Sequence, residues 1–233
     1  MVRRIAIIPA RGGSKRIPNK NIRDFLGKPI ISYTLTAAKK SGLFDKIHVS
    51  TDCKKVIGAV TSLGFEIDFI RPDDLADDHT SIMPVIKYVI NKYLMLGEQF
   101  DEIWLLMACA PMILSDDLIK ASELFNKYNG KISVLSVIEY PAPIEWAFKM
   151  KSSGVLSPEH PGMFSQRSQD IEKKYYDAGA FVVFPVSEIM SANELGMDDN
   201  FVGYVISKDK AIDIDDESDW AFAEAMYLIK NRK

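Results

Sequence analysis

The stretch Arg3-Arg-Ile-Ala-Ile-Ile-Pro-Ala-Arg-Gly-Gly-Ser-Lys-Arg-Ile-Pro-Asn-Lys-Asn21 lies near the start of this 233-residue chain and decides its fold. Its first six residues form a short apolar run, rich in β-branched side chains and ended by Pro9, which predicts a buried strand. Residues 9–28 have neither a helical nor a strand period and are rich in glycine, proline, asparagine and basic residues. We therefore predict a long loop directly after the first strand.

Beyond this loop, strand patterns alternate with helix patterns along most of the chain. Strands are predicted at 46–50, 65–70, 102–107, 132–138, 178–184 and 202–206, and helices at 29–40, 54–63, 80–96, 115–128 and 216–230. Alternation at this spacing predicts βαβ units and a mostly parallel sheet with helices on both faces. The predicted fold class is therefore α/β.

The alternation stops after Glu139. Residues 140–177 contain four of the eleven prolines and little clean periodicity. We interpret this stretch as an inserted arm within a single domain that spans residues 1–233.

Composition excludes several classes of protein. The chain is 47% hydrophobic and 26% charged, with a net charge of −3, which is typical of a folded domain and argues against general nucleic-acid or membrane binding. Its longest apolar run, 103–114, is about half the ~20 residues of a membrane helix. Residues 5–10 are too short for the apolar core of a signal peptide. Cys53 and Cys109 have no metal-binding or redox spacing, so we expect a cytoplasmic location.

The charge is unevenly distributed. Residues 1–28 have eight basic side chains and one acidic one, a net +7, and the remaining 205 residues carry −10. Gly12 and Gly13 let the backbone approach a ligand, Arg11 offers a planar fork of donors, and Lys15 and Lys20 add point charges. We therefore predict a phosphate site, although a solvated basic edge is the alternative. Neither a P-loop nor a dinucleotide-binding fingerprint is present.

A pair of acidic residues near the C-terminal end suggests a metal site. Asp213 and Asp215 are two positions apart, so in an extended segment they point to the same face. Two carboxylates can hold a hard divalent cation whose coordination is completed by substrate phosphates. Their neighbours Asp216, Glu217 and Asp219 are expected only to favour the start of a helix.

Residues 5–22 as a whole resemble the signature loop of the CMP-sialic acid synthetase family of cytidylyltransferases. Further similar segments are Val49-Ser-Thr-Asp52, Phe69-Ile-Arg-Pro72 and Ala211-Ile-Asp-Ile-Asp215, so the resemblance covers nearly the whole chain. It implies a Rossmann-like nucleotidyltransferase fold, CTP and a nine-carbon α-keto acid sugar as substrates, and Mg²⁺ as cofactor. It also implies a homodimer formed through the inserted arm.

The resemblance also assigns roles to individual residues. Its catalytic residues would be Arg11, Lys20 and Asp215, and its metal ligands Asp213 and Asp215. Nucleotide-binding residues would be Ala10, Arg11, Gly12, Gly13, Ser14, Lys15, Asn21, Arg71, Thr80 and Ser81. Structural alternatives are an Arg-Pro loop for Arg71 and helix capping for Thr80 or Ser81.

The sugar is predicted from three further segments. Ala108-Cys-Ala-Pro111, Arg167-Ser-Gln-Asp170 and Tyr176-Asp-Ala-Gly-Ala-Phe181 are more similar to pseudaminic acid cytidylyltransferases than to enzymes that use N-acetylneuraminate, which is the alternative substrate. Arg167 and Gln169 would then bind the sugar, with Arg167 pairing with its carboxylate. The alternative for Arg167 is a salt bridge inside the arm.

Two other functions remain open from the sequence. One is a non-catalytic nucleotide-binding homologue, against which the intact Arg11, Lys20, Asp213 and Asp215 argue. The other is a nucleotidyltransferase that uses UTP or GTP. No histidine is an obvious general base, because His48 lies in a predicted strand and is expected in the core.

Overall fold

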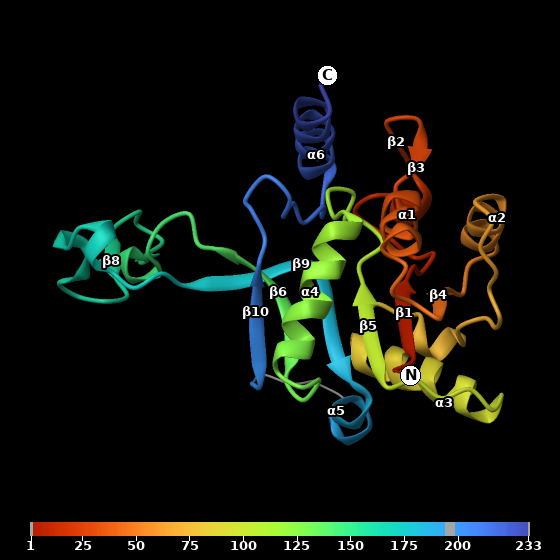
Figure 1. The fold of residues 1–233 in the computed structure, drawn as a ribbon. Coiled ribbons are helices and arrows are strands. Elements are labelled where there is room, and N and C mark those ends of the chain that lie inside the picture. The colour runs from red at the N-terminus through yellow and green to blue at the C-terminus, as the bar shows by residue number, and fades with distance from the viewer. Residues whose placement is uncertain (1, 194–198, 233) are drawn as a thin grey trace.

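The computed structural model describes residues 2–193 and 199–232 and confirms the α/β class. A six-stranded sheet has the strand order β10-β6-β9-β5-β1-β4 (Figure 1). Its strands are β1 (Arg4–Pro9), β4 (Lys46–Ser50), β5 (Glu102–Leu106), β6 (Ser133–Glu139), β9 (Tyr175–Pro185) and β10 (Phe201–Val205). β1 pairs in parallel with β4 and β5, and β10 pairs in parallel with β6. The predicted, mostly parallel sheet is confirmed.

β9 is the exception, because it runs antiparallel between β5 and β6. The chain leaves the sheet at the end of β6, passes through residues 140–174 and returns at the same edge. No helical crossover intervenes, so the returning strand must run in the opposite direction. The start of β9 therefore lies beside the carboxyl ends of its neighbours.

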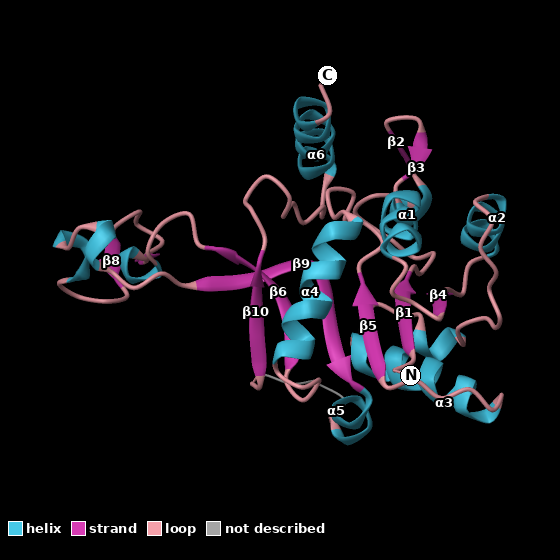
Figure 2. Cartoon of the chain, viewed as in Figure 1, coloured by secondary structure: helices cyan, strands magenta, loops and turns pink. Residues whose placement is uncertain are grey.

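Helices cover both faces of the sheet (Figure 2). They are α1 (Ile31–Ser41), α2 (Lys54–Ser62), α3 (Ile82–Met95), α4 (Ser115–Lys127), α5 (Val186–Ser191) and α6 (Glu217–Lys230). Along β1 the side chains alternate: Ala6 and Ile8 pack into the core with α1, α2 and α4, whereas Ile5 and Ile7 pack against α3 and α5. This burial on both sides explains why the strand is apolar at consecutive positions.

The predicted strand at 65–70 is wrong, since this segment is irregular. β4 is the edge of the sheet, and residues 65–70 cover that edge through side chains. Phe69 stacks on His48 with ring centroids 4.5 Å apart, and the Asp68 carboxylate accepts a hydrogen bond from Lys46. An apolar run can therefore cover a sheet without joining it.

One helix boundary differs from the prediction, and one helix was missed. The first helix begins at Ile31, because β3 (Lys28–Pro29) pairs with β2 (Asp24–Phe25) in a small hairpin. Leu26 and Gly27 form its turn with φ values of 51° and 87°, the positive region that two-residue hairpins require. α5 was not predicted.

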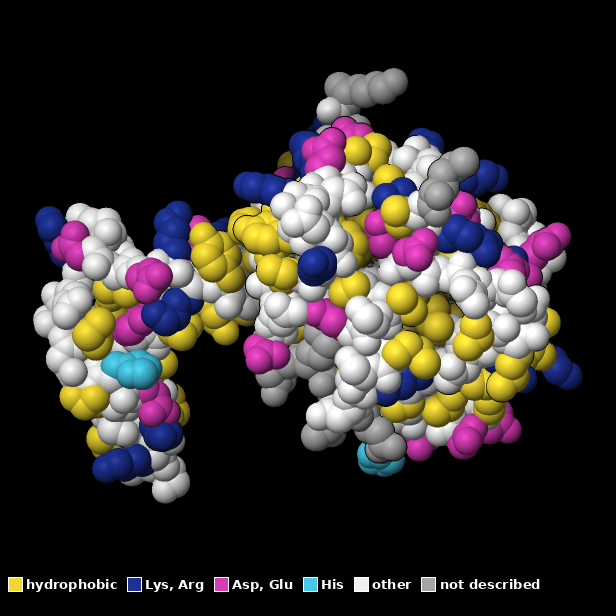
Figure 3. Space-filling model, turned by 60° about the horizontal axis from the view of Figure 1, so that its bottom comes forward, with side chains coloured by type: hydrophobic (Ala, Val, Ile, Leu, Met, Phe, Trp, Pro, Cys, Tyr) yellow, Lys and Arg dark blue, Asp and Glu magenta, His cyan; other side chains and the backbone are white. Residues whose placement is uncertain are grey.

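The segment 140–174 forms an arm that projects from the sheet (Figure 1). It contains the short hairpin β7 (Phe148–Met150) and β8 (Leu156–Pro158). Residues 175–177, predicted as part of the insertion, belong to β9. Figure 3 shows the arm apart from the main body, with hydrophobic side chains on its surface. Phe164 is 64% exposed. That the arm forms a dimer contact stays a prediction.

Within the described parts of the chain, no helix has the length and apolar character needed to cross a membrane.

Candidate active site

The candidate site lies at the carboxyl edge of the sheet, where open α/β sheets bind ligands. The loops after β1, β4 and β5 meet there because these strands are parallel. A cleft of about 300 Å³ opens between them. Its lining includes the predicted residues Arg11, Ser14, Lys20, Asn21, Arg71 and Thr80, together with Pro9, Leu75, Asp77, Asp78, Ile82, Val85 and Met107.

Two backbone N–H groups anchor the loop after β1 to the end of β4 and to the segment that follows it. The Ala10 N–H donates to the Ser50 carbonyl at 2.9 Å, and the Gly12 N–H donates to Asp52 Oδ1 at 3.0 Å. A Cβ atom at Gly12 would lie 2.7 Å from the Cβ atom of Cys53. Glycine is therefore required at position 12 by the protein's own packing, whereas Gly13 faces open space.

Arg11 and Lys15 are held by two acidic residues that sequence reasoning missed. Arg11 Nη1 lies 2.8 Å from Asp78 Oδ1 and also donates to the Asp77 carbonyl, and Lys15 pairs with Asp78 Oδ2. The only feature of the sequence that could have indicated this contact is the acidic pair Asp77 and Asp78, shortly before Thr80. Both cations thus share one carboxylate, which offsets one of their two charges.

Lys20 and Asn21 connect the loop to two other segments. Lys20 Nζ donates to the Ile214 carbonyl at 2.5 Å and lies 3.8 Å from Asp215 Oδ1. Asn21 Nδ2 donates to the Arg11 carbonyl at 3.0 Å, and the thiol of Cys109 donates to Asn21 Oδ1 at 3.3 Å. Burial raises the pKa of Cys109 to about 12, so the thiol stays protonated. Its contact with Asn21 was not predicted.

Arg71 is buried, with 4% of its surface exposed. Its Nε donates to Ser50 Oγ at 3.1 Å and its Nη2 to the Ser50 carbonyl at 2.6 Å. Burial lowers its pKa, the carboxylate of Asp52 opposes this, and the charge of Arg11 adds to it. The guanidinium therefore braces the end of β4 and also lines the cleft.

Thr80 and Ser81 lead into α3. The Thr80 N–H donates to Asp77 Oδ1 at 2.6 Å, and its hydroxyl donates to the Asp74 carbonyl at 3.2 Å. Ser81 occupies the N-cap position of α3, but its side chain makes no capping hydrogen bond there, so the alternative of helix capping holds for its position alone. The role of either residue toward a nucleotide stays a prediction.

Asp213 and Asp215 face the same end of the sheet. A Cβ atom at Gly179, near the start of β9, would lie 3.5 Å from the Asp213 carboxylate carbon. Partial loss of hydration and then the charge of Asp215 raise the pKa of Asp213, whereas Lys20 opposes the shift. Arg16 Nη2 binds Asp215 Oδ1 at 2.8 Å. Two cations of the loop therefore lie beside Asp215, although neither Asp213 nor Asp215 is among the residues that line the cleft.

The next acidic residues act as predicted, at the start of a helix. Asp216 is the N-cap of α6, and its side chain accepts hydrogen bonds from the N–H groups of Ser218 and Asp219. Asp219 Oδ2 in turn accepts the N–H of Asp215 at 2.9 Å. This capping box fixes the backbone beside the acidic pair.

The two carboxylates fit a hard divalent cation, since both offer oxygen ligands. Among the described residues no group of three His, Cys, Asp or Glu side chains could hold a metal. A cation on Asp213 and Asp215 would therefore need water and substrate phosphate oxygens as its other ligands. This is the way Mg²⁺ is usually held in nucleotide sites.

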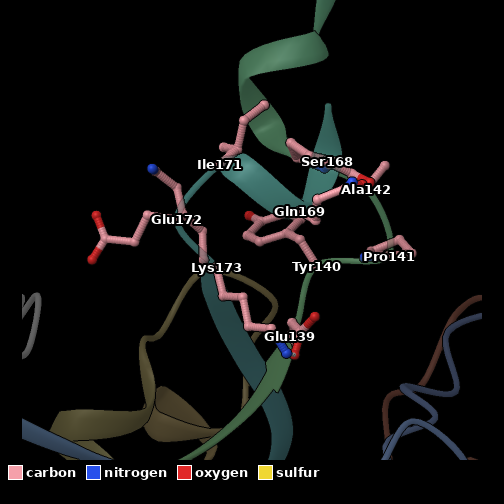
Figure 4. Close-up of a pocket in the computed structure, with 11 residues that line it drawn as sticks. Glu139, Tyr140, Pro141, Ala142, Ser168, Gln169, Ile171, Glu172 and Lys173 are labelled. Atoms are coloured by element: carbon pink, nitrogen blue, oxygen red, sulfur yellow. Dashed lines mark hydrogen bonds and ion pairs between the residues drawn. The ribbon is translucent and has the colours of Figure 1, made fainter. Parts of the chain in front are cut away.

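The predicted sugar ligands lie in the arm and not in the cleft of the same chain. Arg167 Nε binds Asp170 Oδ2 at 2.8 Å, which confirms the alternative of a salt bridge within the arm. Gln169 lines a separate cavity of about 250 Å³ at the base of the arm, beside Tyr140 and Lys173 (Figure 4). One chain does not bring these residues to the cleft.

Comparisons with known proteins place this arrangement in a family. A family model described as cytidylyltransferase matches residues 5–99. The pseudaminic acid cytidylyltransferase of Campylobacter jejuni is 34% identical over 99% of this chain and 98% of its own length. The CMP-N,N'-diacetyllegionaminic acid synthase of Legionella pneumophila is 30% identical over 97% of this chain and 96% of its own length.

A solved structure supports the fold. The structure of CMP:2-keto-3-deoxy-manno-octonic acid synthetase complexed with CTP has a TM-score of 0.72 at 16% identity. The match covers 98% of this chain and 99% of that one. The chain therefore belongs to the family of sugar-acid cytidylyltransferases and is a nucleotidyltransferase.

Proposed function

We propose that this chain transfers the cytidylyl group of CTP to the anomeric hydroxyl of pseudaminic acid, a nine-carbon α-keto acid sugar, and releases pyrophosphate. One observation carries the proposal: Lys20, on the cationic loop after β1, lies 3.8 Å from Asp215 of the acidic pair. A cation that lines the cleft and is suited to phosphates therefore lies beside a carboxylate suited to a divalent metal. A nucleoside triphosphate needs both.

Most of the catalysis in this proposal comes from positioning and charge, as is general for phosphoryl transfer. Arg11 and Lys20 stabilise the negative charge that develops on the leaving pyrophosphate. Arg71 contributes a cation from the floor of the cleft. The remaining nucleotide contacts are assigned to Ala10, Gly12, Gly13, Ser14, Lys15, Asn21, Thr80 and Ser81.

Asp213 and Asp215 hold Mg²⁺ in this proposal. When bound, Mg²⁺ polarises the phosphate that is attacked. Asp219 keeps the backbone N–H of Asp215 engaged, so that the carboxylate of Asp215 stays beside Lys20. The carboxylate of Asp215 also pairs with Arg16 and lies beside Lys20.

We further infer a two-fold dimer in which Arg167 and Gln169 of one copy reach the cleft of the other. Two features support it: both residues lie in the projecting arm, and the arm has exposed apolar side chains such as Phe164. A closed dimer with a two-fold axis is the simplest assembly that supplies two such sites. A cytoplasmic location is proposed as well, and fits the free thiols of Cys53 and Cys109.

The experiment is a pyrophosphate-release assay on the purified chain with Mg²⁺. CTP, UTP and GTP are each combined with pseudaminic acid, N,N'-diacetyllegionaminic acid and N-acetylneuraminic acid. Of the three nucleotides, we expect only CTP to give pyrophosphate release. Among the sugars, pseudaminic acid should have the highest kcat/KM. If N-acetylneuraminic acid is turned over as well as pseudaminic acid or better, the proposed sugar is contradicted. If UTP is turned over, the proposed nucleotide is contradicted. Binding of CTP without turnover of any sugar would indicate a non-catalytic homologue.

A further inference from the structure

The carboxylate of Asp78 binds two of the cations that the proposed function assigns to the nucleotide, Arg11 and Lys15. Arg11 Nη1 lies 2.8 Å from its Oδ1 atom, and Lys15 pairs with its Oδ2 atom. A carboxylate with each oxygen on a different cation resembles the way in which one phosphate group would be bound. The function proposed above gives this residue no role.

The loop before α3 is shaped so that Asp78 points at the cations. Asp77 Oδ1 accepts the N–H groups of His79 and Thr80, at 2.9 Å and 2.6 Å, which forms a tight turn around Asp78. The Asp77 carbonyl accepts a second hydrogen bond from Arg11. Lys15 and then Arg11 keep the pKa of Asp78 below its ordinary value, so the carboxylate is charged at neutral pH.

We propose that Asp78 is a positioning residue, which holds Arg11 and Lys15 in place before the nucleotide arrives and is then displaced from them by the triphosphate. The inference rests on the proposed function, because it needs a polyphosphate ligand. About a third of the Asp78 side chain is exposed, as is Arg11, and Lys15 is 79% exposed. Ion pairs this exposed are weak, so a ligand with several negative charges can replace them.

The exchange has a measurable consequence for affinity. A nucleotide that must first separate Asp78 from two cations binds more weakly than it would to free cations. Ligands that do not contact Arg11 and Lys15, such as cytidine, bind without separating Asp78 from these cations, so their affinity is not lowered. Asp78 therefore lowers the affinity for CTP and for inorganic tripolyphosphate by the same factor.

The test is calorimetric titration of wild type and Asp78→Asn with CTP, tripolyphosphate and cytidine. We expect Asp78→Asn to bind CTP and tripolyphosphate about three- to tenfold more tightly. Their affinities should also depend more steeply on salt, because the cations are then neutralised by the ligand alone. Cytidine affinity should not change. Asp73→Asn is the matched control, since it removes the same charge from the same loop away from Arg11, and it should bind like wild type.

Asp78→Glu distinguishes charge from loop structure, and we expect it to restore affinities close to wild type. If Asp78→Asn binds tripolyphosphate no more tightly than wild type while cytidine binding is intact, the inference is overturned. The same holds if Asp78→Glu behaves like Asp78→Asn. A wild-type chain that binds tripolyphosphate but does not prefer CTP to UTP would instead contradict the proposed function and leave the role of Asp78 in place.

Discussion

The cleft and the arm are built in opposite ways. In the cleft, contacts join residues far apart in sequence: Arg16 binds Asp215 across 199 positions, and Lys20 binds the Ile214 carbonyl across 194. In the arm, ion pairs stay within the segment or its base, as between Arg167 and Asp170, three positions apart, and between Lys174 and Glu145, 29 positions apart. The cleft is therefore held by the whole fold, and the arm by its own short segment.

The difference indicates which part of the molecule has its side-chain partners within one chain. The cleft has buried anchors such as Arg71, with 4% of its surface exposed, and its cations already have anionic partners. The arm leaves Phe164 and Met150 exposed, at 64% and 72%. We expect changes in the cleft to act within one chain and changes in the arm to act on a second copy.

The largest expected effect is in the cleft. Lys20→Ala and Asp215→Asn should each lower kcat/KM for CTP by about 10²–10³, because each removes a charge beside the reacting phosphates. Steady-state pyrophosphate release measures this. Lys54→Ala, an exposed lysine of α2, is the control and should retain activity. Near-normal turnover in Lys20→Ala would show that the cleft is not the reaction site.

The arm is tested by mixing chains. Arg167→Ala should raise KM for the sugar by about tenfold and leave KM for CTP unchanged, because a charged hydrogen bond to the sugar carboxylate is lost.

If the arm serves the partner's cleft, refolding inactive Lys20→Ala with Arg167→Ala chains should produce mixed dimers with one intact site. Activity above the mean of the two separate variants is the expected result. No gain would place the arm's function within its own chain or outside catalysis.

A smaller effect is expected at Cys109, whose thiol orients Asn21 and through it the Arg11 carbonyl. Cys109→Ala should raise KM for CTP by about three- to tenfold, which corresponds to one lost neutral hydrogen bond. Cys109→Ser keeps a donor and should rescue most of the loss. The sugar KM should not change in either variant. Equal KM values for Cys109→Ala and wild type would show that the contact does not position the loop.

The smallest effect on activity is expected behind the cleft, at the fully buried His48. Its Nδ1 contacts the Tyr93 hydroxyl at 3.0 Å, and Nε2 has no hydrogen-bond partner among the described residues. Burial lowers the pKa of His48 from 6.5 to about 4, so the unfolded chain binds this proton first as the pH falls.

The free energy of unfolding that depends on neutral His48 is therefore fully present above pH 6.5. It decreases as the pH falls toward 4, by about 3 kcal/mol in all. His48→Leu should flatten the pH dependence of the free energy of unfolding in this window, measured by urea titration at several pH values. Activity at neutral pH should stay unchanged. An unaltered pH dependence would assign the acid sensitivity to other groups.

Local patterns in the sequence predicted a large part of the fold and the site. The β-branched run of β1 and the glycine-rich, basic loop after it pointed to the α/β class and to the loop that lines the cleft. The alternating segment 211–215 identified the acidic pair. These features are visible because strand burial, loop flexibility and phosphate binding each require particular residue types at neighbouring positions.

Only the tertiary structure decided which segments pair and which charges meet. Residues 65–70 read as a strand but lie outside the sheet, because apolar alternation records burial and not backbone pairing. β9 is antiparallel because the arm returns the chain to the edge that it left. Asp78, which pairs with Arg11 and Lys15, and Cys109, which donates to Asn21, lie 63 to 88 positions away, so no local pattern indicates them. The sequence by itself thus determined which chemistry the chain carries, and the folded sheet determined where that chemistry is brought together.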